Sequence, residues 1–437
     1  RSVPGNGDAF SYEQLTMKRP LLILLLLALT GCAASRTTGR YPASAAPEEK
    51  QYVVILSMDA FRWDLAGRSH TPTLDSLARV GTYAEVVPVY PSNTFPSHYA
   101  MATGLHPAHH GVVNNAFFDR MQGRQLSVFD AEDVKTPGFW GGEPIWNTAE
   151  RQGLTAHIFM WPGSEVPVGG RQATVWTRYS ARPSYRERAD WVVEAMTRPE
   201  EEIPDLVMWY FEQPDAAMHA AGPASPQAVA QAERIDSALC HFFREIRRSP
   251  VFERINFIVT ADHGMTELAP ERCVNLYGLL DTAQVVRTVA GNPLGIELRE
   301  GYADEALRLL RRTPHLRAWH RDRMPRRLRY GTRRDRLANL IVLPDAGWTL
   351  DYSPSARPLG KRGAHGYDPR ERDMHMVFYA SPPSFRKVYS QRSFQNHHIY
   401  LLLCRLLDIE PAPNDCRDRA FEGMLLPQRQ PKHAGRE

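Results

Sequence analysis

Residues 53–59 read VVILSMD, an apolar run that ends in an acid, and two later stretches repeat this pattern. Residues 206–211 read LVMWYF and are followed within four residues by an acid, and residues 255–262 read INFIVTAD. Such runs, separated by helix-like stretches at 73–80 and 227–246, are typical of strands buried on both faces of a parallel sheet. Ligands bind such sheets at the carboxyl ends of the strands. We therefore predict an α/β fold, with a mostly parallel central sheet flanked by helices, and one site that contains Asp59, Asp215 and Asp262.

The composition is that of a large globular protein. The chain has 437 residues, 43% of them hydrophobic, with 53 Lys and Arg against 49 Asp and Glu. This length suits one large domain or a domain with an insertion, since single cores stop growing at roughly 250–300 residues. A disordered chain, a collagen-like fibre and a small disulfide scaffold are excluded. The net charge of +4 is too small to indicate a nucleic-acid partner.

Residues 280–350 have a different character. Strand-like runs at 295–298 and 339–343 enclose a helix-like run at 303–310, which predicts a small α+β insertion without a second core or linker of its own. Twelve arginines and two acids lie between 308 and 336. We interpret this Arg-rich stretch as a solvated surface; the alternative is that it attracts anionic substrates or lipid headgroups.

The N-terminal residues predict export. Residues 1–16 lack periodicity and are interpreted as an upstream or non-native segment. Two basic residues then precede an apolar run at 21–29, which is too short for a bilayer core that needs about 20 residues. Residues 17–31 are therefore predicted to be a cleaved signal peptide.

The end of this segment, Leu29-Thr30-Gly31-Cys32, resembles a bacterial lipobox. That resemblance implies cleavage before Cys32, acylation of its thiol, and a lipid-anchored protein that faces the periplasm or the cell exterior. The alternative is an ordinary signal peptide with a chance cysteine. Residues 32–50 would form a flexible tether, and residues 421–437 a C-terminal tail.

Export would place the other four cysteines where disulfides form. They are Cys240, Cys273, Cys404 and Cys416. The sequence leaves three pairings open. Cys404 and Cys416 are close enough in sequence for a local disulfide, and the alternative is at least one free buried thiol.

Thr94 is the candidate nucleophile. It follows a strand-like run at 84–89 and begins a helix-like segment that ends at Gly104. At a helix N-terminus, free N–H groups and the helix dipole favour an anion. A hydroxyl there can attack or face a phosphate, although a Thr before a helix is usually only an N-cap.

Acidic and imidazole side chains provide candidate metal ligands. Asp215 and His219 are four residues apart, and Pro214 at the first helical position would let them share a face. The complete set is Asp59, Asp215, His219, Asp262, His263 and His365. This mixture of oxygen and nitrogen ligands suits Zn²⁺ better than Mg²⁺ or Ca²⁺. Six ligands are too many for one tetrahedral site, so we predict two Zn²⁺ that share the Thr94 oxygen.

The same segments resemble the nucleotide pyrophosphatase/phosphodiesterases of the alkaline phosphatase superfamily. The resemblance rests on ILSMDAFR at 55–62, TPTL at 71–74, TFP at 94–96, TGL at 103–105, HGVVNN at 110–115, WPGS at 161–164, EQPD at 212–215, ADHGM at 261–265, GAHGYD at 363–368, FQN at 394–396 and PAPN at 411–414. These segments run collinearly from about 52 to 416. The resemblance implies an alkaline-phosphatase-like fold and a phosphodiesterase domain at 51–420.

Carried over residue by residue, the resemblance implies two metal sites. One zinc would bind Asp215, His219 and His365, and the second would bind Asp59, Thr94, Asp262 and His263. Three residues depart from the family pattern: Met218 replaces a Gly, Ser97 an Asn and Pro369 another Asn. None is a ligand, but we expect Met218 to narrow the approach to the first metal.

The resemblance also implies substrate contacts. Thr94 resembles the nucleophile, and Asn115 the side chain that binds the phosphoryl oxygen. Phe95 and Tyr179 resemble the two rings that hold a nucleobase, with Tyr210 near the same pocket.

The implied activity is hydrolysis of nucleotide phosphodiesters and phosphoanhydrides to nucleoside 5′-monophosphates through a threonyl-phosphate. Choline-phosphodiester or lysophospholipid hydrolysis by the same metal site is the alternative. A sulfatase would need a Cys/Ser-x-Pro-x-Arg site, which the cysteines do not match. A phosphomonoesterase would need a further cation beside Thr94, for which the sequence has no clear candidate. A protein that only binds is disfavoured because every implied ligand is present.

Overall fold

The computed structural model describes residues 49–333, 335–355 and 360–427. The predicted signal peptide, Cys32 and nearly all of the tether lie outside these ranges. Within them, no helix combines the length and apolar character that a membrane span requires.

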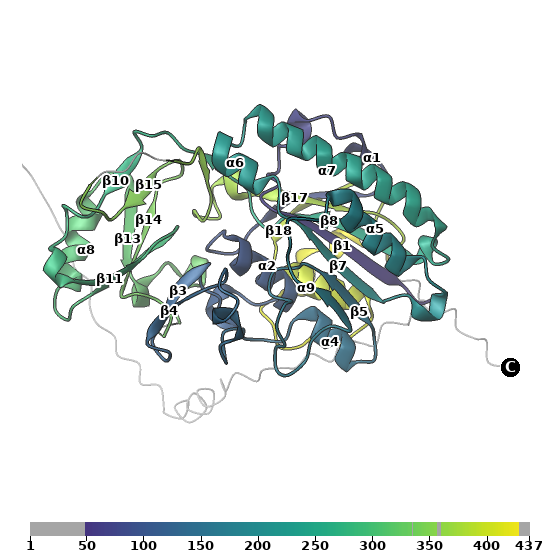
Figure 1. Ribbon diagram of the computed structural model, residues 1–437, viewed down its shortest axis with the longest axis horizontal. Coiled ribbons are helices and arrows are strands. Elements are labelled where there is room, and N and C mark those ends of the chain that lie inside the picture. The colour runs from purple at the N-terminus through teal and green to yellow at the C-terminus, as the bar shows by residue number, and fades with distance from the viewer. Residues whose placement is uncertain (1–48, 334, 356–359, 428–437) are drawn as a thin grey trace, which may run out of the picture. The chain divides into compact units, whose positions relative to one another are not determined.

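An eight-stranded sheet with the order β18-β2-β17-β8-β1-β7-β5-β6 forms the centre of the domain (Figure 1). Its strands are β1 (Tyr52–Met58), β2 (Thr82–Val87), β5 (Ala156–Phe159), β6 (Val175–Thr177), β7 (Leu206–Phe211), β8 (Ile255–Thr260), β17 (Met376–Ala380) and β18 (Tyr389–Gln395). β17 pairs antiparallel with β2 and β8, and the other neighbours pair parallel. All residues of β1, β7 and β8 are buried, as their continuous apolar runs predict.

Helices cover both faces of this sheet, which confirms the predicted α/β architecture (Figure 1). One face carries α1 (Pro72–Val80), α5 (Tyr185–Met196) and α7 (Pro226–Glu245), and the other carries α2 (Thr94–Thr103), α4 (Ile145–Arg151) and α9 (His398–Leu406). The short helices are α3 (Pro107–His110) and α6 (Asp215–Ala221). α7 begins where the Ser225 hydroxyl accepts a hydrogen bond from the Ala228 amide. Its buried Ala232, Ile235 and Leu239 recur at helical spacing and therefore form one apolar face.

The predicted insertion is an antiparallel sheet, β11-β12-β14-β13, packed against α8. Its elements are β11 (Val285–Val289), β12 (Leu294–Leu298), α8 (Ala303–Arg312), β13 (Leu316–His320) and β14 (Leu340–Pro344). Shorter pairs are β10 (Cys273–Asn275) with β15 (Thr349–Asp351), β9 (Thr266–Glu267) with β16 (Gly363–Ala364), and β3 (Ala116–Asp119) with β4 (Arg124–Ser127). The sequence analysis expected no second core with a linker of its own, and the insertion does contain a second buried cluster. Ile296, Leu310 and Val342 belong to a separate buried cluster, because α8 presents an apolar stripe to one face of this sheet.

The Arg-rich stretch is only partly a solvated surface. Arg336 is 5% exposed, and its guanidinium donates to the carbonyls of Gly111 and Phe139 at 2.6 and 2.8 Å. Arg317 and Arg327 both donate to the buried carboxylate of Asp368. These arginines connect the insertion to the rest of the domain. The prediction of a mainly solvated surface did not include this structural role.

The C-terminal boundary of the domain lies later than predicted. Residues 421–427 were expected to belong to a tail, but Phe421 and Met424 are fully buried. The Arg386 amide also donates to the Met424 carbonyl at 2.8 Å. The ordered domain therefore extends beyond residue 420, because these apolar side chains cover its core.

The predicted local disulfide is not present. Cys240, Cys273 and Cys404 carry free thiols, and Cys404 is buried, which agrees with the alternative of a free buried thiol. The Cys416 thiol instead donates to the His397 carbonyl at 3.2 Å.

Candidate active site

Three acids lie at adjacent carboxyl ends of the central sheet. β1 lies between β7 and β8 and pairs parallel with both, with Met58 opposite Phe211 and Ser57 opposite Thr260. The acids that follow these strands are Asp59, Asp215 and Asp262. The sequence-based expectation that they share one edge of the sheet is confirmed.

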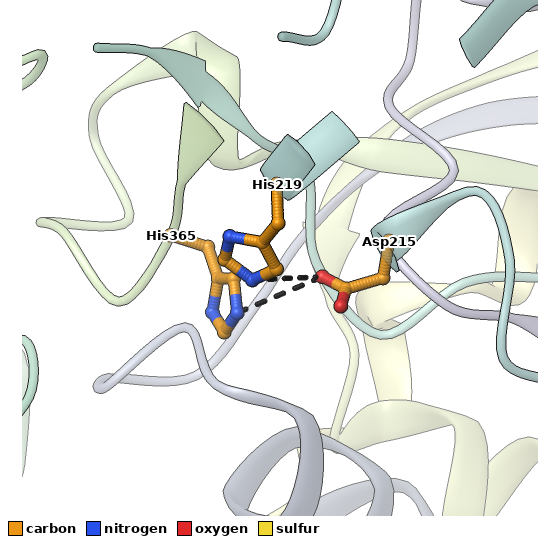
Figure 2. Close-up of side chains that lie close together, drawn as sticks. All are labelled: Asp215, His219 and His365. Atoms are coloured by element: carbon orange, nitrogen blue, oxygen red, sulfur yellow. Dashed lines mark ion pairs between the residues drawn. The ribbon is translucent and has the colours of Figure 1, made fainter. Parts of the chain in front are cut away.

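The first ligand group consists of Asp215, His219 and His365 (Figure 2). α6 begins at Asp215, so the i, i+4 spacing puts the His219 ring beside the carboxylate. The Nε2 atoms of His219 and His365 lie 3.3 and 3.7 Å from Asp215 Oδ1. Pro214 is the N-cap rather than the first helical residue, a shift of one position from the prediction.

The second group contains Asp59, Asp262 and His263, all buried. His263 Nε2 lies 3.5 Å from Asp59 Oδ1 and 3.2 Å from Asp262 Oδ2. Thr94 Oγ1 is 3.2 Å from the same nitrogen. The rings of His263 and His365 stack with centroids 3.8 Å apart, so the two groups are adjacent.

The remaining ring nitrogen of each histidine faces a backbone carbonyl. Nδ1 lies 2.7 Å from the Gly363 oxygen in His219, 3.0 Å from the Ser92 oxygen in His365 and 2.8 Å from the Gly264 oxygen in His263. A carbonyl only accepts, so Nδ1 carries the proton and Nε2 keeps its lone pair. Burial lowers the pKa of His219 to about 4, which keeps this ring neutral near pH 7. Neutral, oriented imidazoles are suitable metal ligands.

The carboxylates fit a bound cation. One buried oxygen on each of Asp59, Asp215 and Asp262 has no hydrogen-bond partner. Burial, together with the charge of Asp262, raises the pKa of Asp215 to about 8 and that of Asp59 well above its usual range. Buried carboxylates this close are stable as anions only when a positive charge compensates them. The donor set of both groups therefore fits a divalent metal ion, with mixed oxygen and nitrogen ligands as in zinc sites.

Thr94 is the first residue of α2, as predicted, and Asn93 is the N-cap. The Phe95 amide donates to Asn115 Oδ1 at 3.2 Å, which leaves the Asn115 NH₂ group as a donor. Thr94 Oγ1 and Asn115 therefore flank the same helix N-terminus, where the dipole favours an anion.

His98 contacts the candidate site, and the sequence analysis did not single it out. This fully buried ring places Nε2 2.8 Å from the Ser57 hydroxyl and Nδ1 2.9 Å from the Thr94 carbonyl. Nδ1 also lies 3.3 Å from Asp262 Oδ2. His98 thus connects β1, the start of α2 and a ligand carboxylate. Its four-residue spacing from Thr94 on α2 was the one signal available in the sequence.

Tyr210 contacts the metal-ligand group as well as the predicted ring pocket. Its hydroxyl donates to Asp59 Oδ2 at 2.5 Å. Its ring centroid lies 6.1 Å from that of Tyr179, a side chain 43% exposed. The sequence analysis placed Tyr210 near the pocket of Tyr179, but it did not predict the hydrogen bond from Tyr210 to Asp59.

Further aromatic rings surround Phe95. Its centroid lies 5.9 Å from Phe129 and 6.3 Å from Trp140. Phe129 is 76% exposed and forms an exposed edge of this group of rings. The sequence analysis missed Phe129 because a single aromatic residue in a loop has no periodicity. Among the described residues, the ring contacts include none between Phe95 and Tyr179. That these two rings hold a nucleobase between them stays a prediction.

Met218 does not narrow the site as expected. Its side chain is fully buried in the main core, because it lies on the inward face of α6. Met218 therefore fills the core next to the first ligand group.

The Thr94 hydroxyl lies at a helix N-terminus beside two groups of candidate metal ligands, at the carboxyl edge of the sheet, and this arrangement suits the hydrolysis of phosphate esters. Residues 53–368 match the family model described as type I phosphodiesterase / nucleotide pyrophosphatase. The chain belongs to this family. Enzymes of this family use metal ions, in agreement with the two ligand groups.

Individual relatives agree with this assignment. The chain is 33% identical over 405 residues to an uncharacterized pyrophosphatase/phosphodiesterase of Schizosaccharomyces pombe, covering 88% of this chain and 82% of that protein. It is 32% identical to human ectonucleotide pyrophosphatase/phosphodiesterase family member 5, over 84% of this chain and 76% of that one. It covers only 47% of mouse family member 3, at 30% identity. A solved structure of murine family member 5 matches with a TM-score of 0.80 at 29% identity, covering 86% of this chain and all of that one. Another solved structure is an inactive variant of that murine protein in complex with AMP.

Proposed function

We propose that this protein is an exported, two-zinc nucleotide pyrophosphatase/phosphodiesterase that forms a threonyl-phosphate intermediate. The observation that carries the proposal is the position of Thr94 Oγ1, 3.2 Å from His263 Nε2 and at the N-terminus of α2. The unpartnered buried oxygens of Asp59, Asp215 and Asp262 support two metal sites beside it. When bound, zinc would neutralise phosphate charge and favour the ionised form of the Thr94 hydroxyl.

The residues of the chain define the course of the reaction. Thr94 Oγ1 loses its proton to solvent and attacks phosphorus, the bond to the leaving oxygen breaks, and the nucleoside phosphoryl group remains on Thr94 as a phosphodiester. The Asn115 NH₂ group and the N-terminus of α2 bind the non-bridging oxygens, where charge collects. Water then attacks the same phosphorus, releases the nucleoside monophosphate and restores the Thr94 hydroxyl.

The aromatic rings can hold a nucleobase, and a choline ester is disfavoured because the acids near Tyr179 already have partners. Phe95, Phe129 and Tyr179 offer faces and edges on which any base can stack. A choline site would need a carboxylate or an aromatic cage for the quaternary ammonium. The acids near Tyr179 are engaged elsewhere: Glu165 accepts from the Tyr179 amide and Arg178, and Glu212 pairs with Arg188. The AMP complex of the murine relative also supports a nucleotide substrate.

The experiment compares two substrates on the purified, zinc-loaded protein. We expect kcat/KM for a nucleoside 5′-phosphate aryl ester to exceed that for aryl phosphorylcholine. A preference for aryl phosphorylcholine of about tenfold or more would replace the nucleotide assignment with the choline one. Loss of both activities on chelation, with recovery on addition of Zn²⁺, tests the metal requirement separately.

We also propose that Cys32 is acylated and holds the protein at a bacterial membrane. The support is the lipobox-like Leu29-Thr30-Gly31-Cys32 and the polar stretch that follows it. These residues lie outside those that the structure describes.

A further inference from the structure

A second pocket lies between α3 and the connection from β13 to β14. Its volume is about 320 Å³, and it is lined by His109 and by residues between 321 and 332. None of these residues belongs to the two ligand groups or to the aromatic surface beside Thr94. The volume falls at the lower end of the range for small-molecule sites, about 300–1,000 Å³. The pocket is thus a separate place where a small ligand can bind.

Two arginines of one short turn line this pocket. Residues Arg326–Leu328 form a 3₁₀ helix, and Arg329 follows it as the C-cap with a left-handed backbone, φ 46° and ψ 47°. Both Arg326 and Arg329 line the pocket. Arg327, between them, donates instead to Asp368, and Leu328 is buried. The Arg-rich stretch thus divides into arginines that hold the fold together and arginines that face this pocket.

The walls of the pocket are held in place by buried contacts. The Tyr330 hydroxyl donates to the Val113 carbonyl at 2.8 Å, and Tyr330 is 3% exposed. Arg321 donates through Nη1 to the Leu337 carbonyl at 2.9 Å. A pocket whose walls are already ordered loses little conformational entropy when a ligand binds.

The lining is strongly cationic. Arg321, Arg326 and Arg329 contribute three guanidinium groups, and the acid among the described lining residues, Asp322, lies 4.0 Å from Arg321 Nε and offsets part of this charge. His109 Nδ1 lies 2.7 Å from the Asp415 carboxylate, and this hydrogen bond raises the pKa of His109 and favours its cationic form. Clustered positive charges repel one another, and an anion among them removes that repulsion.

We propose that this pocket binds a small phosphate-bearing anion, either free or as a lipid headgroup. Guanidinium groups present paired N–H donors that match two phosphate oxygens, so Arg326 and Arg329 would provide most of the affinity. This binding does not depend on the proposed hydrolysis, because Thr94 and the metal ligands take no part in it.

The test uses the full chain with Cys32→Ala in every sample, so that an acyl group cannot contribute to vesicle binding. Calorimetry measures binding of inorganic phosphate and of glycerol 1-phosphate. Cosedimentation measures binding to phosphatidylcholine vesicles with and without phosphatidylglycerol. Arg326→Gln with Arg329→Gln is compared with Arg308→Gln and Arg312→Gln, two exposed arginines of α8 that give the same change in charge.

We expect the pocket variant to bind its probe at least about tenfold more weakly and the α8 variant to bind like the parent. If the pocket variant binds the soluble phosphates more weakly, the ligand is a free phosphate. If its weaker binding is confined to anionic vesicles, the ligand is a lipid headgroup. Equal binding by the two double variants to every probe would overturn the proposal. The double variant Arg326→Lys with Arg329→Lys keeps the charge and should restore binding. Parental thermal stability of both glutamine double variants would show that lost binding is not caused by misfolding. Aryl phosphodiester turnover should stay at the parental value in the pocket variant, so a failure here is distinct from failure of the proposed hydrolase function.

Discussion

The Tyr210 hydroxyl donates a hydrogen bond of 2.5 Å to Oδ2 of Asp59, whose other carboxylate oxygen is buried without a partner. This arrangement leaves the unpartnered oxygen 3.5 Å from His263 Nε2, in the second group of candidate metal ligands. Partners of this kind contribute about 10- to 100-fold to metal affinity or activity. We therefore expect Tyr210→Phe to weaken zinc binding by about that factor, measured by competition with a chromophoric chelator. Tyr83→Phe, which removes a hydroxyl from β2, is the control, and an equal effect of both changes would contradict this role.

Thr94→Ala should lower diesterase kcat by at least about three orders of magnitude, because it removes the proposed nucleophile. Thr94→Ser keeps a hydroxyl and should retain more activity than the alanine variant. Rapid acid quenching of the parent should trap phosphorus on Thr94, detected by peptide mass. Activity of Thr94→Ala within tenfold of the parent would show that another group attacks phosphorus.

Phe95→Ala should reduce kcat/KM for a nucleoside phosphate ester far more than for a small bis-aryl phosphate. Stacking on one aromatic ring contributes about 1–3 kcal/mol per base. Phe129→Ala should have the same direction of effect but a smaller size, since that ring is 76% exposed. Steady-state kinetics with both substrates provide the comparison, and equal losses on the two would mean that Phe95 shapes the phosphate site instead.

Acid should destabilise the protein through a buried histidine cluster at His106, His397 and His398. Ring centroids are 4.4 Å apart for His106 and His397 and 4.0 Å for His397 and His398. Burial lowers the pKa of His106 and of His398 to about 4 from an ordinary 6.5. Between pH 4 and 6.5 the unfolded chain therefore binds more protons than the folded protein. The contribution of these histidines to the free energy of unfolding is at its maximum above pH 6.5 and decreases as the pH falls toward 4.

His398→Gln should flatten this dependence by roughly one proton, measured by urea unfolding at several pH values between 7.5 and 4.5. His70→Gln changes an exposed histidine and is the control. A parental slope in His398→Gln would show that other groups cause the acid sensitivity.

Cys32→Ala should abolish acylation. In a Gram-negative host the parent should partition into detergent and carry the mass of an acylated cysteine at its N-terminus, whereas the variant should remain soluble or uncleaved. A parental N-terminus that begins after Cys32 would exclude the lipoprotein assignment.

Local patterns in the sequence determined the central architecture. Apolar runs such as 53–58 predicted fully buried parallel strands because no polar side chain interrupts them, and the acids that follow them then had to lie at one edge of the sheet. The i, i+4 spacing of Asp215 and His219 and the position of Thr94 before an apolar helix were equally local. Each of these features depends on neighbouring residues, which periodicity reports directly.

Only the tertiary structure decided which distant groups meet. The hydrogen bond from Tyr210 to Asp59, the contacts of His98 and the burial of Arg336 each join segments far apart in sequence. A side chain such as Arg336 looks like a surface residue in a basic stretch, and it is buried because carbonyls of a distant loop accept its hydrogen bonds. Likewise, Arg326 and Arg329 line a pocket while Arg327, between them, pairs with Asp368, which is distant in sequence. Charge is a property of the sequence, whereas its compensation depends on packing between elements that the sequence does not place together.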